Sequence, residues 1–330
     1  YHNRDRLDED SSQLIGTTSF PPFLLGVPAP FNAPLEHVAE RADIEAQHIF
    51  APAENLRLVW GGGLRHDAVR SKLYLGSDEP LSYRQRNIFG NLEWRPMRAL
   101  VVNLGAMVER NSFVGTKTSP RLGVNYHPTP AQTIRAALGR AYRNPVLYEQ
   151  QGDERWIFPM LSPAGRGIPA SLPLQYIYGQ NNLRPERIDS RELGYLLELG
   201  HGSSVDIKYS YDTLTGLIEM YTFNCCGTSV PGTVRTFGNR GGAGVHSFEL
   251  QWQQRLTENT KIHLGWSSAR IANGSAAPAA AAYAYERTAP RHALNLLLAH
   301  QLSAGWRASL GAYHVGSVQA ISGDRLPAYT

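Results

Sequence analysis

Apolar and polar residues alternate with a period of two along most of this chain, and this alternation limits its fold more than any other feature. From Val205 to Asp212, apolar or aromatic residues at odd positions stand between charged or polar residues at even positions. Side chains of a β-strand point alternately to opposite faces, so each such segment makes a strand with one apolar and one polar face. The pattern predicts an all-β protein with about twelve strands, near residues 37–50, 55–69, 85–95, 100–112, 119–128, 132–143, 189–200, 204–223, 234–255, 260–272, 290–301 and 306–318.

The connections between these strands alternate in length. The short ones are predicted at 51–54, 95–99, 128–131, 200–203, 257–259 and 303–305, and the long ones at 70–84, 144–188, 224–233 and 273–289, with a modest link at 113–117. In an antiparallel up-and-down sheet every second connection lies at the same end. All the short turns therefore lie at one end and nearly all the long loops at the other, an asymmetry typical of bacterial outer-membrane barrels.

Alternation alone does not say which face points outward, because a soluble lipocalin-like barrel has the same period with its apolar face inward. The polar positions carry acids, bases and amides that are costly to bury in a dry core: Asp43, Glu45, Gln47, Arg57, Asn91, Glu93, Arg135, Glu249 and Gln251. Several segments have the roughly nine to eleven residues needed to cross a bilayer. Aromatic residues stand beside the short turns in the apolar register, as an interfacial girdle requires: Phe50, Trp94, Tyr126, Trp252 and Trp306. We therefore predict an antiparallel up-and-down transmembrane β-barrel, with a soluble β-protein as the less favoured alternative.

The composition argues against several other classes of protein. No window approaches the roughly 18 apolar residues of a membrane-spanning helix, and the net charge of +4 is spread along the chain, which argues against nucleic acid as a partner. Cys225 and Cys226 cannot make a structural zinc site by themselves, and a vicinal disulfide and two free thiols both remain open. The histidines show no metal-ligand spacing, and neither a Gly-x-Ser-x-Gly nor a His-Glu-x-x-His motif occurs. We expect no cofactor, no metal site and no enzymatic activity.

Two motifs in the middle of the chain resemble a known family. Ser119-Pro120-Arg121-Leu122, followed by Arg140-Ala141-Tyr142-Arg143-Asn144-Pro145-Val146-Leu147-Tyr148-Glu149, resembles the mid-barrel segment of TonB-dependent receptors. Asn182-Leu183-Arg184-Pro185-Glu186, followed by Ser190 and Glu192-Leu193-Gly194-Tyr195, resembles a second segment of that family in the expected order. The likeness extends from about Arg41 to the end of the chain. Physically, Pro145 suits the release of a strand into a loop, and Pro185 keeps the chain extended before the next strand.

The resemblance implies an incomplete barrel. The family's barrel has 22 strands and a plugged lumen, whereas this chain predicts about twelve strands and neither a plug domain nor a TonB-contacting segment. We expect residues 1–330 to form a single partial barrel domain that is an internal fragment of a longer receptor. Within it, residues 1–35 are expected to contain a strand end and an extracellular loop, and residues 144–188 the longest extracellular loop.

The resemblance also implies a function: ligand-gated, TonB-energised uptake of a scarce nutrient across the outer membrane of a Gram-negative bacterium. A ferric siderophore or cobalamin is the expected cargo, so a metal chelate or corrinoid, the outer-membrane lipid and the TonB-ExbB-ExbD system are the expected partners. Residues in the longest loop that can stack on and pair with such a ligand are Arg155, Trp156, Phe158, Arg166, Tyr176 and Tyr178. Residues expected to face a plug in the lumen are Arg135, Arg143 and Glu192. A passive porin-like channel and a surface barrel used for adhesion or assembly are the alternatives.

Overall fold

A computed structural model of the chain describes residues 2–7, 10–14, 30–34, 37–159, 171–223, 234–274, 283–303, 305–321 and 323–330. Side chains are described for 37–154 and 177–222, and for the described residues from 234 onward.

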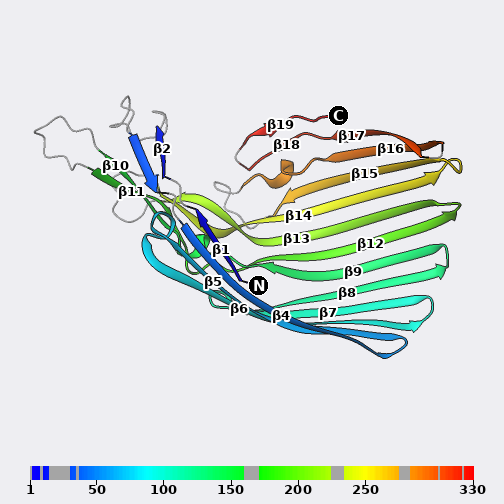
Figure 1. The fold of residues 1–330 in the computed structure, drawn as a ribbon, viewed down its shortest axis with the longest axis horizontal. Coiled ribbons are helices and arrows are strands. Elements are labelled where there is room, and N and C mark those ends of the chain that lie inside the picture. The colour runs from blue at the N-terminus through cyan, green and yellow to red at the C-terminus, as the bar shows by residue number, and fades with distance from the viewer. Residues whose placement is uncertain are drawn as a thin grey trace, which may run out of the picture.

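A single antiparallel path of strands runs through almost the whole molecule (Figure 1). Its members, in spatial order, are β1 (His2–Leu7), β4 (His37–Ala53), β5 (Leu56–Ser71), β6 (Ser77–Met97), β7 (Leu100–Asn111), β8 (Gly115–Thr129), β9 (Gln132–Arg143), β12 (Glu186–Gly200), β13 (Ser203–Phe223), β14 (Val234–Arg255), β15 (Thr260–Asn273), β16 (His292–Ser303) and β17 (Trp306–Val315). Consecutive strands pair with their neighbours except where β2 and β3 intervene between β1 and β4, and β10 and β11 between β9 and β12. The result is a curved, open sheet with β1 at one edge and β17 at the other.

The remaining elements are short. They are α1 (Lys72–Leu75), α2 (Leu147–Gln151), the 3-10 helix η2 (Tyr285–Arg287), and the hairpins β2 (Asp10–Leu14) with β3 (Pro30–Pro34), β10 (Asp153–Pro159) with β11 (Ser171–Tyr178), and β18 (Val318–Gln319) with β19 (Arg325–Leu326).

No helix among the described residues is both long and apolar enough to cross a membrane.

Each of the twelve predicted strands is present, and β1 adds an antiparallel partner for β4. One expectation about the connections needs correction. The loop predicted at 70–84 is only the single helical turn of α1, because β5 and β6 continue to Ser71 and from Ser77 and pair there. The segment predicted as the longest loop contains α2 and the β10–β11 hairpin, and β12 already begins at Glu186.

The connections after β4, β6, β8, β12, β14 and β16 are all short and lie at one end of the sheet, on the right of Figure 1. The connections after β5, β7, β9, β13 and β15 lie at the other end, and they range from the short link at 112–114 to the long segment between β9 and β12. We call these the turn end and the loop end. The turn between β12 and β13 is the tightest case: Gly200, His201 and Gly202 all have positive φ, at 76°, 51° and 72°. Two of these three residues are glycine, which adopts this conformation without steric cost.

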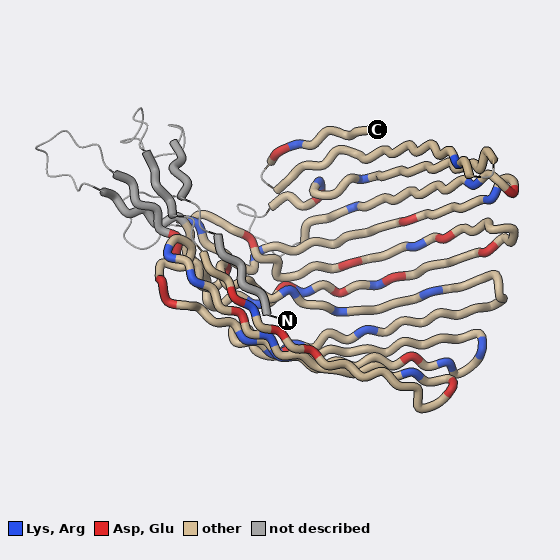
Figure 2. Tube along the Cα trace, in the orientation of Figure 1, with Lys and Arg blue, Asp and Glu red and all other residues tan. Residues whose placement is uncertain are grey.

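The register between neighbouring strands places apolar residues beside apolar residues and polar residues beside polar residues. Leu58, Leu92, Leu104, Leu122 and Leu138 are successive partners from β5 to β9. Directly paired residues project from the same face of a sheet, so this row defines what we call the leucine face. The opposite side, the polar face, carries rows such as Arg57, Glu93 and Asn103. Acidic and basic residues are interspersed along the strands (Figure 2).

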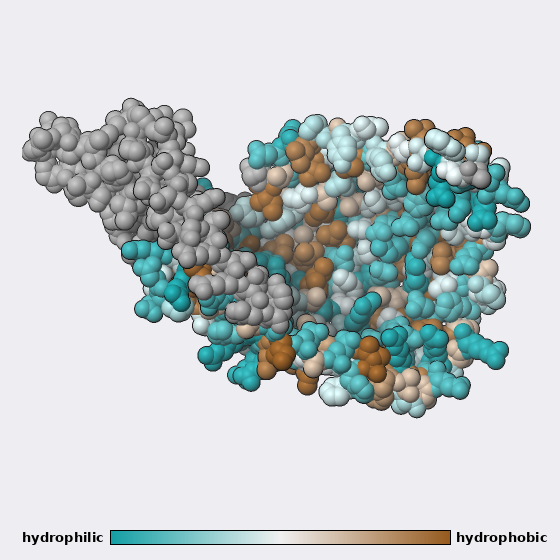
Figure 3. All heavy atoms as spheres, viewed as in Figure 1, coloured by the Kyte–Doolittle hydropathy of each residue, from teal (hydrophilic) through white to brown (hydrophobic). Residues whose placement is uncertain are grey.

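Burial is concentrated at the loop end. The buried apolar side chains in the described residues are Leu73, Leu75, Ile177, Leu183, Val234, Phe237 and Ala243. The wall itself is one sheet thick, and large apolar side chains such as Leu138, Leu193 and Leu310 are more than half exposed. Hydrophilic residues predominate at the turn end in the face drawn in Figure 3. The positions of the buried apolar side chains show that other elements pack over the sheet at the loop end.

Candidate functional sites at the loop end and on the polar face

A compact cluster of side chains holds the loop between β9 and β12 against the sheet. Ile177, Leu183 and Phe237 are buried together, and the partly buried Tyr148, Ile218 and Met220 pack around them; we call these six residues the rim cluster. They come from α2, β11, the segment before β12, β13 and β14. The rim cluster thus joins five parts of the chain at the mouth of the sheet.

Aromatic contacts extend the rim cluster to α1. The ring of Tyr148 meets that of Phe237 edge-on at 5.9 Å and that of Tyr74 at 5.8 Å. The Tyr148 hydroxyl donates a hydrogen bond to the buried carboxylate of Glu154. Burial, and then the negative charge of Glu154, raise the pKa of Tyr74 above its ordinary value. These contacts fix α1 and α2 to each other across separate connections.

Backbone pairing fixes the base of the β10–β11 hairpin. β11 pairs in parallel with β14 at Ile177 and Tyr178, and the Thr236 hydroxyl donates to the Tyr178 carbonyl at 2.7 Å. The Gly179 amide donates to the Gly152 carbonyl at 2.6 Å. The hairpin therefore crosses from β9 over to β14 before the chain returns to form β12.

Arg143 binds two carboxylates where β9 ends. Its guanidinium donates to both oxygens of Glu186 at 2.6 and 2.8 Å and to Glu149 at 3.1 and 3.3 Å. Glu149 also accepts from the Val146 amide at 2.8 Å, and Glu186 from the Ile218 amide at 2.7 Å. Both family-like motifs thus meet in one ionic network that ties the two ends of the loop together.

Asn239 clamps the second motif from β14. Its side-chain oxygen accepts from the Arg184 amide, and its side-chain nitrogen donates to the carbonyls of Arg184 and Gly216, each at 2.7 Å. Gly216 has φ of 67° and lies at the irregularity in the β13–β14 pairing. No motif pointed to Asn239, because its function depends on a partner 55 residues away in the chain.

A buried carboxylate lies near the end of β13 that is at the loop end of the sheet. Glu219 is 0% exposed and accepts a hydrogen bond from the Tyr285 hydroxyl at 2.7 Å. Burial first, and the hydrogen bond to Glu219 second, raise the pKa of Tyr285 well above its ordinary value, which keeps the hydroxyl protonated as a donor. This contact joins η2 to the sheet, and no sequence pattern predicted it.

The polar face holds a second charged site closer to the turn end. The Arg135 guanidinium donates to both oxygens of Asp206, at 3.1 and 2.5 Å. It reaches across β12 at Gly194, where an added Cβ would lie 2.9 Å from it. Arg135, Glu192 and Asp206, with Lys208, Glu249 and Gln251, line a cavity of about 290 Å³.

The predicted plug-facing residues therefore separate into two places. Arg135 and Glu192 line the same cavity, whereas Arg143 lies eight residues further along β9, roughly 26 Å away along the strand. Of the predicted ligand residues, Tyr178 is 42% exposed at the end of β11. Arg155, Trp156, Phe158 and Tyr176 lie on the backbone of the β10–β11 hairpin, but their side chains are outside the described part, and Arg166 is outside it altogether.

Metal-binding geometry is absent from the described residues, where no three His, Cys, Asp or Glu side chains are grouped so as to hold an ion. Cys225 and Cys226 lie outside the described residues.

The chain matches known proteins over most of its length. The family model described as "TonB dependent receptor-like, beta-barrel" matches residues 41–330. The ferric enterobactin receptor of Pseudomonas aeruginosa is 27% identical over 133 residues, which are 40% of this chain and 15% of that protein.

Solved structures share the fold. A variant of the ferric enterobactin receptor of Pseudomonas aeruginosa has a TM-score of 0.75 at 16% identity, over 99% of this chain and 49% of that one. The siderophore receptor PirA from the same species has a TM-score of 0.70 at 15% identity, over 87% and 51%. The FrpB iron transporter of Neisseria meningitidis has a TM-score of 0.65 at 14% identity, over 92% and 48%. The chain spans about half the length of these structures.

Proposed function

This chain belongs to the TonB-dependent receptor β-barrel family, and from this we propose that it supplies part of the wall of an outer-membrane receptor that takes up a ferric siderophore. The fold is the family's antiparallel transmembrane barrel, present here as an incomplete wall, and no plug domain is found among the described residues. Receptors of this family are transporters and not enzymes. In the membrane the leucine face contacts lipid and the polar face lines the lumen.

The observation that carries the proposal is the fixed loop over the mouth of the barrel. The rim cluster, the Arg143 network and the Asn239 clamp hold the base of the β10–β11 hairpin against β13 and β14. A loop with an immobilised base can present side chains to a ligand at a low entropic cost. In our proposal the loop end faces outward, so this hairpin meets the ligand before it enters the lumen.

A ferric siderophore is preferred to cobalamin as the cargo. The relatives named above are siderophore receptors and an iron transporter. Ferric catecholate chelates are anionic and carry aromatic rings. The proposed ligand residues suit such a complex because guanidinium groups attract negative charge and aromatic side chains stack on rings. They are Arg155, Trp156, Phe158, Arg166, Tyr176 and Tyr178.

The polar-face cavity is proposed as a contact for a plug. Arg135, Glu192, Asp206, Lys208 and Glu249 present both signs of charge to the lumen, and the ion pairs within the cavity, Arg135–Asp206 and Lys208–Glu249, are partly exposed. A plug surface of complementary charge can dock there and be released when the TonB-ExbB-ExbD system does work on it. Arg143 has a different proposed role, which is to hold the ligand-binding loop.

Iron uptake by cells tests the proposal. Deleting the gene that encodes this chain should abolish uptake of a ferric catecholate siderophore, and removing TonB from the parent strain should have the same effect. In the strain that lacks only the gene for this chain, uptake of a ferric hydroxamate and of cobalamin serves as the control and should be unchanged. Loss of cobalamin uptake alone would assign the corrinoid instead, and catecholate uptake that persists without TonB would favour the porin-like channel. Unchanged uptake of every substrate would favour the adhesion or assembly barrel.

A further inference from the structure

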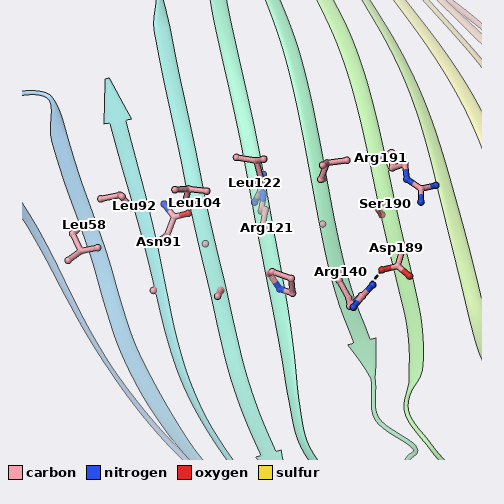
Figure 4. A pocket seen from close by; sticks show the side chains of 16 residues that line it. Leu58, Asn91, Leu92, Leu104, Arg121, Leu122, Arg140, Asp189, Ser190 and Arg191 are labelled. Carbon is pink, nitrogen blue, oxygen red and sulfur yellow. Dashed lines mark hydrogen bonds and ion pairs between the residues drawn. The ribbon is translucent and has the colours of Figure 1, made fainter. Parts of the chain in front are cut away.

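An open groove of about 740 Å³ crosses the leucine face from β6 towards β12. Its floor is a row of small residues, Gly90, Ala106 and Pro120, which are partners in register on β6, β7 and β8. The leucine row, with Leu92, Leu104 and Leu122, stands on the turn side of this floor (Figure 4). A row of small side chains beside a row of large ones leaves a trough whose walls are apolar.

The leucine row changes character where the groove ends. Leu138 on β9 is paired with Arg191 on β12, which is paired with Tyr211 on β13 and then with His246 on β14. The Arg191 guanidinium lies 5.6 Å from the Tyr211 ring centroid, and the His246 ring stacks on Tyr211 at 4.5 Å. A cation held over an aromatic ring thus closes the apolar trough.

Two further arginines lie beside Arg191. Asp189 accepts from Arg140 Nε at 2.6 Å and lies 2.9 Å from Arg187 Nε, on opposite oxygens. The Arg140 and Arg187 side chains are 42% and 40% exposed, and Arg191 is exposed. Three arginines and one aspartate give this group a net charge of +2. One carboxylate oriented between two guanidinium groups leaves an excess of positive charge facing outward.

The position of these arginines matches the edge of the lipid-facing band. On β12 the leucine face is apolar from Leu199 to Leu193 and becomes charged from Arg191 onward, towards the loop end. Six residues of strand cover about 20 Å, close to the height of roughly 25 Å of the apolar band of such barrels. Cations at that edge meet lipid head groups, where their desolvation cost is low.

We propose that Arg140, Arg187 and Arg191, together with the groove, bind an anionic membrane lipid whose head group ends in a phosphate. The phosphate lies against the arginines and one acyl chain lies in the groove. Guanidinium groups match phosphate oxygens in pairs, and an acyl chain in the groove gains van der Waals contacts with the leucine side chains along its walls. The charge and the trough adjoin, which favours a lipid over a soluble anion. The inference rests on the membrane placement proposed above and is independent of the cargo.

Native mass spectrometry of the whole detergent-purified receptor, titrated with defined lipids, tests this site. Dipalmitoyl phosphatidic acid should bind about tenfold more tightly than dipalmitoyl phosphatidylcholine, because its phosphomonoester carries a net negative charge, whereas the choline ammonium neutralises the phosphodiester of phosphatidylcholine. The double substitution Arg140→Gln with Arg191→Gln should remove this preference. Arg57→Gln, which removes an exposed arginine from the polar face, is the matched control and should retain it.

The groove is tested with Ala106→Leu, which fills the floor without changing charge. This variant should lose the preference of dipalmitoyl over dioctanoyl phosphatidic acid and keep the preference for phosphatidic acid over phosphatidylcholine. Equal binding of the two head groups by the unaltered receptor would overturn the proposal, as would an equal loss in the Arg57→Gln control. Competition by inorganic phosphate at the same concentration as the lipid would reduce the site to an anion site and overturn the lipid assignment. Because no siderophore is present, a wrong cargo assignment leaves these results unaffected.

Discussion

The loop end and the turn end of this wall are built from the same strands but are held together differently. At the turn end the strands are joined by short connections and by pairing with their two neighbours, the Arg135–Asp206 pair reaches across one strand, and large apolar side chains remain exposed. At the loop end the rim cluster, the Asn239 clamp and the Glu219–Tyr285 contact join segments that are far apart in sequence. Pairing between neighbouring strands therefore carries most of the wall, whereas the loop end depends on long-range side-chain packing.

Removing the centre of the rim cluster should have the largest effect. Phe237→Ala deletes a buried ring that contacts Tyr148, so we expect the loop end to lose about 4 kcal/mol of local stability. Hydrogen exchange measures this as faster exchange of the amides of β11 and α2. Tyr126→Ala, a half-exposed aromatic at the turn end, is the matched control and should cost about 1 kcal/mol or less. Similar losses of local stability in the two variants would mean that the loop end does not depend more on side-chain packing than the turn end.

Removing the hydroxyl that binds the buried acid should have the next largest effect. Tyr285→Phe leaves the Glu219 carboxylate without that donor in a fully buried position, which should cost about 2 to 3 kcal/mol. The expected readout is proteolytic cleavage near η2 at lower protease concentration. The double variant Tyr285→Phe with Glu219→Gln should recover part of the loss, because an uncharged amide costs less to bury. If the single variant resists protease as the parent does, this contact does not hold the loop end.

The division between the two ends also explains what the sequence could predict. Alternation and turn spacing predicted the twelve strands because each strand's faces are set locally, and the resemblance predicted the barrel family. Arg143 and Glu186 were recognised as parts of the two family-like motifs. The hydrogen bonds that Arg143 makes to both Glu186 and Glu149 were not predicted, because they form only when the loop folds back. Asn239 and Glu219 gave no signal because a single polar residue in an alternating strand looks like any other polar position, and Tyr285 gave none because η2 lies in a connection outside the strand pattern. The loop at 70–84 was predicted too long because polar residues in 77–84 continue β6 beyond the apolar pattern.

Asn239→Ala tests whether the second motif needs its clamp. It removes three hydrogen bonds of 2.7 Å, including one from the Arg184 amide, and we expect a loss of about 2 kcal/mol. Faster amide exchange should be confined to the segment before β12 and to the irregularity at Gly216. Asn125→Ala, on β8 near the turn end, is the control and should change exchange little. A loss spread evenly over the wall would mean that the clamp acts on the whole sheet.

Gly194→Ala should have the smallest effect and gives the sharpest test of the turn-end half. The new Cβ would lie 2.9 Å from the Arg135 guanidinium and push it off its path to Asp206. The pair is about 30% exposed on both sides, and such pairs contribute little, so we expect less than about 1 kcal/mol. Gly139→Ala, where an added Cβ meets nothing within 4 Å, is the control for the change in backbone freedom. Thermal unfolding in detergent compares the two variants. A loss above about 2 kcal/mol for Gly194→Ala alone would show that a side-chain network also holds the turn-end half, and the two ends would then differ in degree and not in kind.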